Sequence, residues 1–108
     1  MDAVLHALAD SGRRTVIEAL RNGEVSAGEL AALLPIARPG VSRHLRVLRE
    51  AGLVEVRSDA QRRMYRLKTE PLVELDDWLD SYRGLWRTRL DALHTEVARE
   101  STEKGNLT

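Results

Sequence analysis

The side chains best suited to chemistry in this sequence are arginines that recur along one short stretch. Arg43, Arg46 and Arg49 follow one another at three-residue steps within residues 37–52, and Ser42 stands among them. A guanidinium group donates hydrogen bonds in a planar fork that matches phosphate oxygens and the O6 and N7 atoms of guanine. These side chains therefore predict an anion-binding surface, with nucleic acid as the expected polyanion.

The same stretch has the pattern of a helix that is anchored on its other side. Val41, Leu45 and Leu48 recur at i, i+4 and i+7, so they share one helical face and are predicted to enter the core. Pro39 falls in the first turn, where a helix tolerates proline, and Gly52 follows the last periodic residue, where a left-handed residue ends a helix. A short rod with one apolar and one cationic face has the right size for the DNA major groove.

The distribution of charge supports this interpretation better than its sum does. The 108 residues contain 17 basic and 17 acidic side chains, and this neutral balance argues mildly against nucleic-acid binding. Lys68 and Lys104 are the two lysines among the 17 basic residues, which leaves fifteen arginines. Eight of these lie at positions 38, 43, 46, 49, 57, 62, 63 and 66, a segment with three acids at 50, 55 and 59. A GC-rich genome would explain the arginine content but explains the clustering less well.

Composition excludes several classes of protein. The length suits one domain with a modest core, which we place at residues 1–100. The absence of cysteine excludes disulfides and thiol redox chemistry and fits a cytoplasmic location. The sequence begins without the pattern of a signal peptide, and no apolar stretch is long enough to cross a bilayer. The sequence has neither a nucleophile–base arrangement nor a glycine-rich phosphate loop, so it does not indicate an enzyme, and we expect no cofactor.

Two short helices are predicted at the start of the chain. An amphipathic pattern covers residues 2–9. Asp10 or Ser11 is placed to cap a second helix over residues 13–21, and an Asn-Gly pair at 22–23 is typical of the left-handed turn that ends a helix.

A third helix precedes the arginine-rich one. Ser26 and Glu29 have the spacing of a capping box, in which each side chain satisfies a free amide of the other residue. This helix is predicted to bury Leu30, Leu33 and Leu34, and a proline then stops it. A short helix, a brief turn and a second helix with a basic face together make a helix-turn-helix.

After residue 52 the apolar residues change from a helical period to a period of two. Residues 53–57 and 63–68 alternate apolar and polar side chains, and a polar turn at 58–61 separates them. This pattern predicts a β-hairpin, and a basic hairpin after a helix-turn-helix is a wing. The side chains expected to reach the DNA backbone or minor groove from it are Arg57, Gln61, Arg62 and Arg63.

The last third of the chain predicts a long helix with a wide apolar stripe. The helix is expected over about residues 70–99, and its apolar side chains recur at intervals near 3.5 residues. The stripe exceeds what a small core needs, so we predict a homodimer interface rather than packing against the first helix of the same chain. The predicted interface residues are Val4, Leu5, Leu8, Leu75, Trp78, Leu79, Tyr82, Leu85, Trp86 and Leu93. Residues 101–108 are polar and are expected to form a disordered tail.

Several runs of residues also carry a resemblance to a known family. The runs ALAD at 7–10, GELA at 28–31, VSRHL at 41–45 and AGLV at 51–54 resemble the ArsR/SmtB family of bacterial winged-helix repressors. The run YRGLWRTRLDAL at 82–93 is similar to a metal-free branch of that family. The resemblance extends over nearly the whole chain, to about residue 97.

The resemblance implies a winged helix-turn-helix fold, mainly α-helical with a small β-hairpin, that forms a homodimer through its first and last helices. It also implies a repressor that binds double-stranded DNA at a palindromic operator. The recognition-helix residues that it places at the DNA are Arg38, Pro39, Ser42, Arg43, His44 and Arg46. By family position, Arg38 and Arg43 are candidates for base edges. Ser42, His44 and Arg46 are candidates for phosphates, although a packing role for His44 is equally open.

Three departures from the family pattern bear on the structure. Ala37 stands where the family often has Ser or Thr, and alanine should cost about 1 kcal/mol of helix capping. Ser11 and Gly12 replace a common Pro-Thr pair, which affects the start of the second helix. The predicted wing lacks the usual glycine at its tip.

Two alternatives stay open beside a DNA-binding repressor. The first is a metal- or ligand-responsive sensor, because many members of this family hold metals. Residues 30–33 offer no metal ligand here, and the last helix has one histidine, His94, on the same face as Asp91. We therefore expect no four-ligand metal site. The second alternative is a protein-interaction module without DNA binding, which the neutral net charge and the aromatic last helix support.

Overall fold

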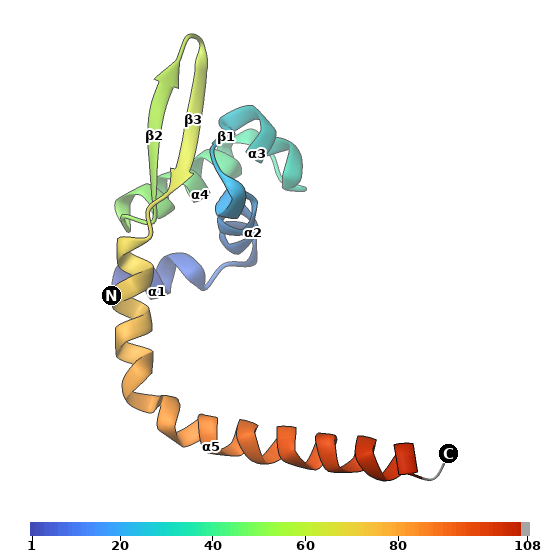
Figure 1. The fold of residues 1–108 in the computed structure, drawn as a ribbon. Coiled ribbons are helices and arrows are strands. Elements are labelled where there is room, and N and C mark those ends of the chain that lie inside the picture. The colour runs from blue at the N-terminus through green and yellow to red at the C-terminus, as the bar shows by residue number, and fades with distance from the viewer. Residues whose placement is uncertain (107–108) are drawn as a thin grey trace. The chain divides into compact units, whose positions relative to one another are not determined.

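The structure is a computed structural model that describes the backbone of residues 1–106 and the side chains of residues 1–97. The chain divides into two units, Met1–Leu75 and Asp76–Thr108, and each is described by itself. The first unit carries short helices and a small antiparallel sheet, and the second is helical (Figure 1). The predicted fold class, mainly α-helical with a β-hairpin, is confirmed. The division at residue 75 falls inside the segment that was predicted to be one domain.

The helices of the first unit follow the predicted order. They are α1 (Asp2–Leu8), α2 (Ser11–Ala19), the 3-10 turn η1 (Leu20–Asn22), α3 (Ala27–Leu33) and α4 (Arg38–Glu50). The second helix begins at Ser11, earlier than predicted, with Asp10 as its extended N-cap residue. The capping box is present in α3: the Ser26 hydroxyl accepts a hydrogen bond from the Glu29 amide at 3.2 Å and donates one to the Glu29 carboxylate at 2.9 Å.

The sheet contains the predicted hairpin and one further short strand. Its order is β1-β3-β2, with β1 (Val25–Ser26), β2 (Val54–Asp59) and β3 (Arg62–Leu67) antiparallel. Asp59 pairs with Arg62, so the hairpin loop is shorter than the predicted four-residue turn. Ala60 in that loop has a φ of 57°, the left-handed region in which a Cβ costs roughly 1–2 kcal/mol.

The core of the first unit lies between its helices and the sheet. Leu30, Leu48 and Leu53 are fully buried there, and Val41 and Leu45 are 4% and 5% exposed, so the predicted apolar face of α4 is confirmed. Leu34 is also buried, as predicted.

Two residues differ from their predicted positions. Leu33 is 53% exposed rather than buried, because Leu34 leaves the helix with an extended backbone and takes the inward position instead. Val4, predicted at the dimer interface, is 5% exposed and packs in the core of its own chain. The physical reason is that α1 contacts both α2 and α4 and points Val4 and Ala7 between them.

The helix α5 (Glu70–Asn106) is longer than predicted. Its start belongs to the first unit, where Leu72 packs against the core. The backbone stays helical over residues 101–106, which were expected to belong to a disordered tail, and residues 107–108 of that tail lie outside the described residues. Over the part of the chain that the structure describes, none of the helices has an apolar run of the length that a bilayer crossing requires.

Candidate nucleic-acid interface

The backbone of α4 is fixed firmly at its end and left without a side-chain cap at its start. Ala37 is the N-cap residue and provides no capping side chain, while its carbonyl accepts from the amides of Gly40 and Val41 at 3.0 and 3.2 Å. At the other end Gly52 has a φ of 79°, as predicted, and its amide donates to the Arg49 carbonyl at 3.0 Å. The Leu53 amide donates to the Leu48 carbonyl at 3.0 Å, which completes a Schellman motif.

The polar face of α4 is exposed and cationic. Arg38, Ser42, Arg43, Arg46 and Arg49 are all exposed. None of the four arginines forms an ion pair or a side-chain hydrogen bond with another described residue, whereas arginines elsewhere in the chain pair with Glu18, Glu24 or Glu29. Their guanidinium groups are therefore available for contacts with a polyanion. Pro39 is exposed in the first turn beside them.

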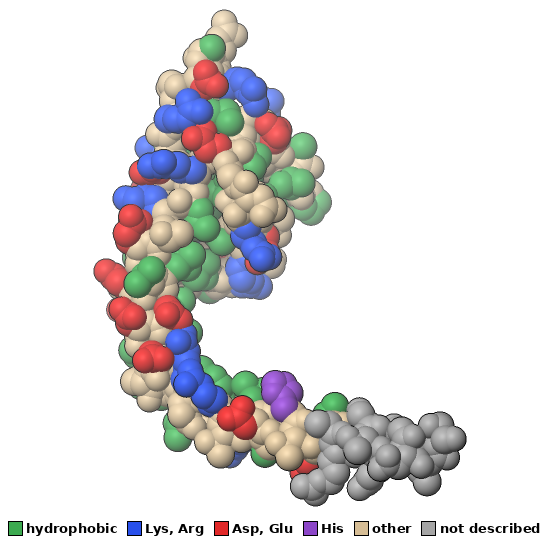
Figure 2. Space-filling view, in the orientation of Figure 1, with side chains coloured by type: hydrophobic (Ala, Val, Ile, Leu, Met, Phe, Trp, Pro, Cys, Tyr) green, Lys and Arg blue, Asp and Glu red, His purple; other side chains and the backbone are tan. Residues whose placement is uncertain are grey.

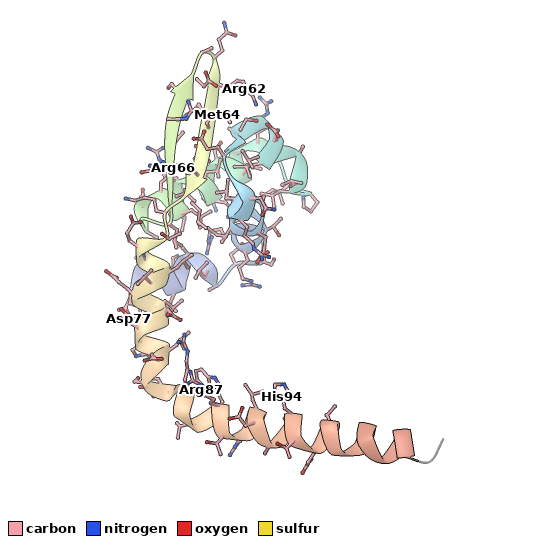
Figure 3. All side chains as sticks on the ribbon, viewed as in Figure 1. Arg62, Met64, Arg66, Asp77, Arg87 and His94 are labelled. Carbon is pink, nitrogen blue, oxygen red and sulfur yellow. The ribbon has the colours of Figure 1, made fainter. Side chains whose placement is uncertain are left out.

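Two of the predicted wing arginines are held by acidic neighbours. The Arg57 Nε donates to both carboxylate oxygens of Glu24, at 3.0 and 2.9 Å. Arg62, which Figure 3 labels on the hairpin, pairs with Glu29 at 3.1 Å. The hydrogen bond from Arg57 holds the pKa of Glu24 below its ordinary value and raises the pKa of Arg57 in turn. These pairs offset part of the positive charge that the sequence assigned to the wing.

Arg63 differs from the other wing arginines. Side chains alternate between the faces of a strand, so Arg63 shares a face with Tyr65 and lies opposite to Arg62. It has no ion-pair partner among the described side chains, and it lines a groove together with α4. Gln61 is exposed at the hairpin loop. Arg63 thus lies on the side of the hairpin that faces α4.

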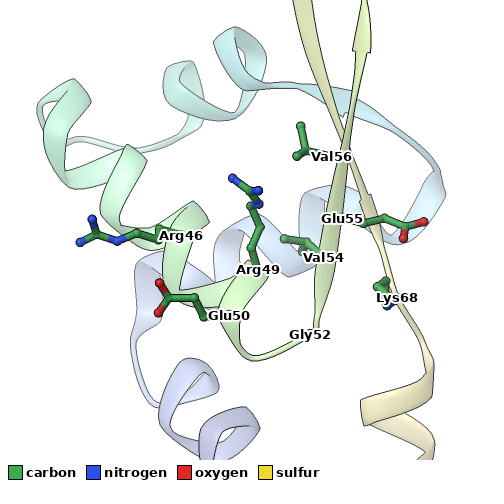
Figure 4. A pocket seen from close by; sticks show the side chains of 8 residues that line it. All are labelled: Arg46, Arg49, Glu50, Gly52, Val54, Glu55, Val56 and Lys68. Atoms are coloured by element: carbon green, nitrogen blue, oxygen red, sulfur yellow. The ribbon is translucent and has the colours of Figure 1, made fainter.

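Two open hollows flank α4. One, of about 390 Å³, lies between α3, α4 and β3, and Arg38, Arg46, Arg49 and Arg63 stand on its lining. The other, of about 450 Å³, lies between α4 and β2 and is lined by Arg46, Arg49 and Lys68 among others (Figure 4). Because both hollows are lined by Arg46 and Arg49, these two arginines stand between them.

Arg49 belongs to the arginine-rich face that its three-residue spacing from Arg46 predicted, but the family resemblance did not place it at the DNA. In the structure it lines both hollows. Figure 2 shows basic side chains gathered over the wing and the adjoining end of α4, with acidic side chains among them. The cationic surface is therefore local, and it agrees with a chain whose net charge is zero.

His44 faces the protein rather than the polar side of α4. Its side chain is 17% exposed, and its Nε2 lies 3.6 Å from Oδ2 of Asp10. Its Nδ1 lies 3.4 Å from a terminal nitrogen of Arg13. This geometry supports the packing role for His44 over the phosphate contact that the family resemblance suggested.

The structure offers no metal site within its described residues. No three or more His, Cys, Asp or Glu side chains gather there in a way that could hold an ion. Asp91 and His94, the pair considered from the sequence, are exposed on α5, where Figure 3 labels His94.

Comparisons with known proteins agree with this geometry. A family model described as a helix-turn-helix domain matches residues 8–57. The HTH-type transcriptional regulator Rv2034 of Mycobacterium tuberculosis is 44% identical over 81 residues, which cover 75% of this chain and 76% of that protein. The transcriptional repressor SdpR of Bacillus subtilis is 30% identical over 79 residues, which cover 73% of this chain and 88% of that protein.

A solved structure shows the same fold. The crystal structure of an ArsR family transcriptional regulator superposes with a TM-score of 0.72 at 28% identity, and the match covers 80% of this chain and 89% of that one. The shared architecture, the basic recognition helix and these relatives point to transcriptional regulation rather than to an enzyme. The chain belongs to the ArsR/SmtB family of winged helix-turn-helix, DNA-binding transcriptional regulators.

Proposed function

We propose that this protein is a homodimeric, sequence-specific repressor that reads double-stranded DNA with α4 of each protomer. The observation that carries the proposal is the division of α4 into two faces. Val41, Leu45 and Leu48 anchor one face in the core. The other face exposes four arginines without ion-pair partners among the described residues. A rigid helix with free guanidinium forks is suited to the major groove.

Within this surface the side chains have different roles. Arg38 and Arg43, near the start of α4, are the proposed contacts to base edges, because the first turns of a recognition helix approach the bases. Ser42, Arg46 and Arg49 are the proposed contacts to phosphates. The amides at the start of α4, which lack a side-chain cap, suit a phosphate as well.

The proposed dimer uses apolar side chains that the single chain leaves exposed. Leu85, Leu93 and Val97 on α5 are 73%, 55% and 60% exposed, and Leu5 on α1 is 43% exposed. Apolar surface of this extent is typical of an interface between subunits. A two-fold axis between protomers would present two recognition helices to half-sites about one DNA turn, roughly 34–36 Å, apart.

Selection of bound duplexes from a random pool tests whether the protein binds DNA sequence-specifically as a dimer. The proposal predicts an enriched inverted repeat whose half-site centres lie about one turn apart. Recovery of sequences with no common half-site would contradict it and would favour the protein-interaction alternative.

Repression is proposed to be steric, because a bound dimer covers promoter DNA. In transcription with purified polymerase, the protein should repress a promoter that overlaps the selected operator. It should have no effect when the operator is moved well upstream. Repression that does not depend on this spacing would contradict occlusion.

A further inference from the structure

Three side chains connect the recognition helix to the junction of α1 and α2. His44 extends from α4 toward Asp10 and Arg13, its Nε2 3.6 Å from Oδ2 of Asp10 and its Nδ1 3.4 Å from a terminal nitrogen of Arg13. Arg13 also donates to the last turn of α1, through its Nε to the Ala7 carbonyl at 2.6 Å and through its other terminal nitrogen to the His6 carbonyl at 3.0 Å. One guanidinium group therefore contacts both α1 and α4.

The hydrogen-bonding roles in this cluster follow from the arginine. A guanidinium group has only donors, so the Nδ1 of His44 must accept from Arg13. In a neutral imidazole the other nitrogen then carries the proton, and this nitrogen lies 3.6 Å from Oδ2 of Asp10, a distance too long for a hydrogen bond. The Oδ2 atom of Asp10 is buried and has no hydrogen-bond partner among the described residues. The imidazole is thus placed between a cation and an anion, with a donor or an acceptor suited to each.

Two neighbouring residues are adapted to this arrangement. Asp10 is the N-cap residue of α2, yet its side chain makes no capping hydrogen bond and approaches His44 instead. Gly12 leaves room for the imidazole, since a Cβ at that position would lie 2.9 Å from the His44 Nε2. Such a contact is too short for the ring to stay in place.

We propose that Asp10, Arg13 and His44 form a clamp that fixes the orientation of α4, and that His44 is a positioning residue for sequence recognition that does not touch DNA. The proposal rests on the proposed function. Hydrogen bonds to base edges require placement within about 0.5 Å, whereas attraction to phosphates tolerates larger shifts. Loosening the clamp should therefore weaken binding to the operator and leave binding to unrelated DNA unchanged.

The test measures the affinity of the full chain for the selected operator and for an unrelated duplex in the same buffer. His44→Leu and Asp10→Asn should each reduce operator affinity about tenfold, comparable to the loss of one base contact. Both should leave affinity for the unrelated duplex and the salt slope unchanged. His44→Gln, whose amide has both a donor and an acceptor, should restore most of the preference. Glu18→Gln, on an exposed carboxylate of α2, is the matched control and should have no effect.

A second variant separates positioning from stability. Gly12→Ala keeps all three polar groups but displaces the imidazole. Alanine has a higher helix propensity than glycine, so thermal stability should stay the same or rise while the preference for the operator falls. A purely structural role for the cluster would instead make stability and operator affinity fall together.

Several results would overturn the clamp. Equal losses on both duplexes with a smaller salt slope would make His44 a phosphate contact. If the double variant Asp10→Asn/His44→Leu loses the sum of the single effects, the two side chains act independently. If the wild-type protein prefers the operator over the unrelated duplex and the variants keep this preference in full, the clamp is wrong and the proposed function stands. A wild-type protein that does not discriminate would overturn the proposed function and the clamp with it.

Discussion

At the scale of single residues, the arginines divide according to their neighbours. Arg13 binds carbonyls of α1, and Arg57 pairs with Glu24, so these side chains hold the first unit together. Arg43 and Arg46 have no such partner among the described residues and stay exposed. The residue type is the same in all four cases. Whether an arginine serves the fold or an external anion depends on the acids and carbonyls within reach.

Arg43→Ala should weaken binding to the operator by about 1–3 kcal/mol and relax selectivity at one base pair in each half-site, because a bidentate contact to a base edge is lost. Competition among operators that differ at single positions measures this. Arg21→Ala, which removes an exposed charge of η1, is the control. An equal loss on every sequence would assign Arg43 to phosphates.

The Arg57–Glu24 pair predicts a pH effect. The pKa of Glu24 is lowered in the folded state, so the pair stabilises the fold above the unfolded pKa of this carboxyl, and the contribution is lost as pH falls through the folded pKa. Arg57→Ala should raise the pKa of Glu24 toward its ordinary value. A carboxyl titration by NMR measures this shift. An unchanged pKa would show that the pair does not persist in solution, and Arg57 would then be free to contact DNA.

At the scale of elements, periodicity predicted the helices and the hairpin, because their apolar faces are long enough to show a period. The face of α4 is the clearest case, and Val41, Leu45 and Leu48 are all buried. The strand β1 was missed, because Val25–Ser26 is too short to alternate. The prediction that Leu33 is buried was wrong. At this point α3 ends, and the backbone at Leu34 rather than the helical spacing of the leucines decides which side chain enters the core.

The part of the candidate site that lies within one helix was predictable, because it depends on local spacing. Spacing along α4 identified Arg43 and Arg46, which are exposed as expected. It did not show that Glu24 and Glu29, more than thirty residues before their partners, would pair with Arg57 and Arg62. Nor did it show that His44 would face Asp10. Contacts between distant segments depend on packing, which local pattern does not contain.

The uncapped start of α4 predicts a simple gain in stability. Ala37→Ser should place a hydroxyl acceptor at the N-cap position and stabilise the folded state by about 1 kcal/mol. Thermal or urea denaturation measures the change. Ala37→Val, which has no acceptor, should give no such gain. Equal effects of the two substitutions would mean that capping is not what limits the stability of this helix.

At the scale of the whole molecule, the two units have different surfaces. The first unit buries a continuous core. The second leaves large apolar side chains exposed. The rings of Trp78 and Tyr82 in this unit are stacked edge to face, with their centroids 5.2 Å apart. Exposed apolar surface of this extent is typical of an interface with another subunit. The proposed dimer supplies that partner through a second copy of the same helix.

Leu93→Glu should weaken the dimer, because a charge would have to be buried in the apolar interface. We expect the dimer dissociation constant to rise about a hundredfold or more in sedimentation experiments, and operator affinity to fall with it. Thr95→Glu adds the same charge two residues away, on the opposite side of the helix, and should leave the dimer intact. A monomeric wild-type protein, or equal effects of the two substitutions, would contradict the proposed interface.

The most direct test of DNA binding by α4 is the salt dependence of operator binding. Because the net charge of the chain is zero, a steep dependence must come from the local arginines of α4 and the wing. The logarithm of the affinity should fall linearly with the logarithm of salt concentration, with a slope of about −0.9 for each phosphate neutralised. Arg46→Ala should reduce the slope by about two in a dimer, one for each protomer. A flat salt response of the wild-type protein would show that α4 does not bind DNA through these arginines.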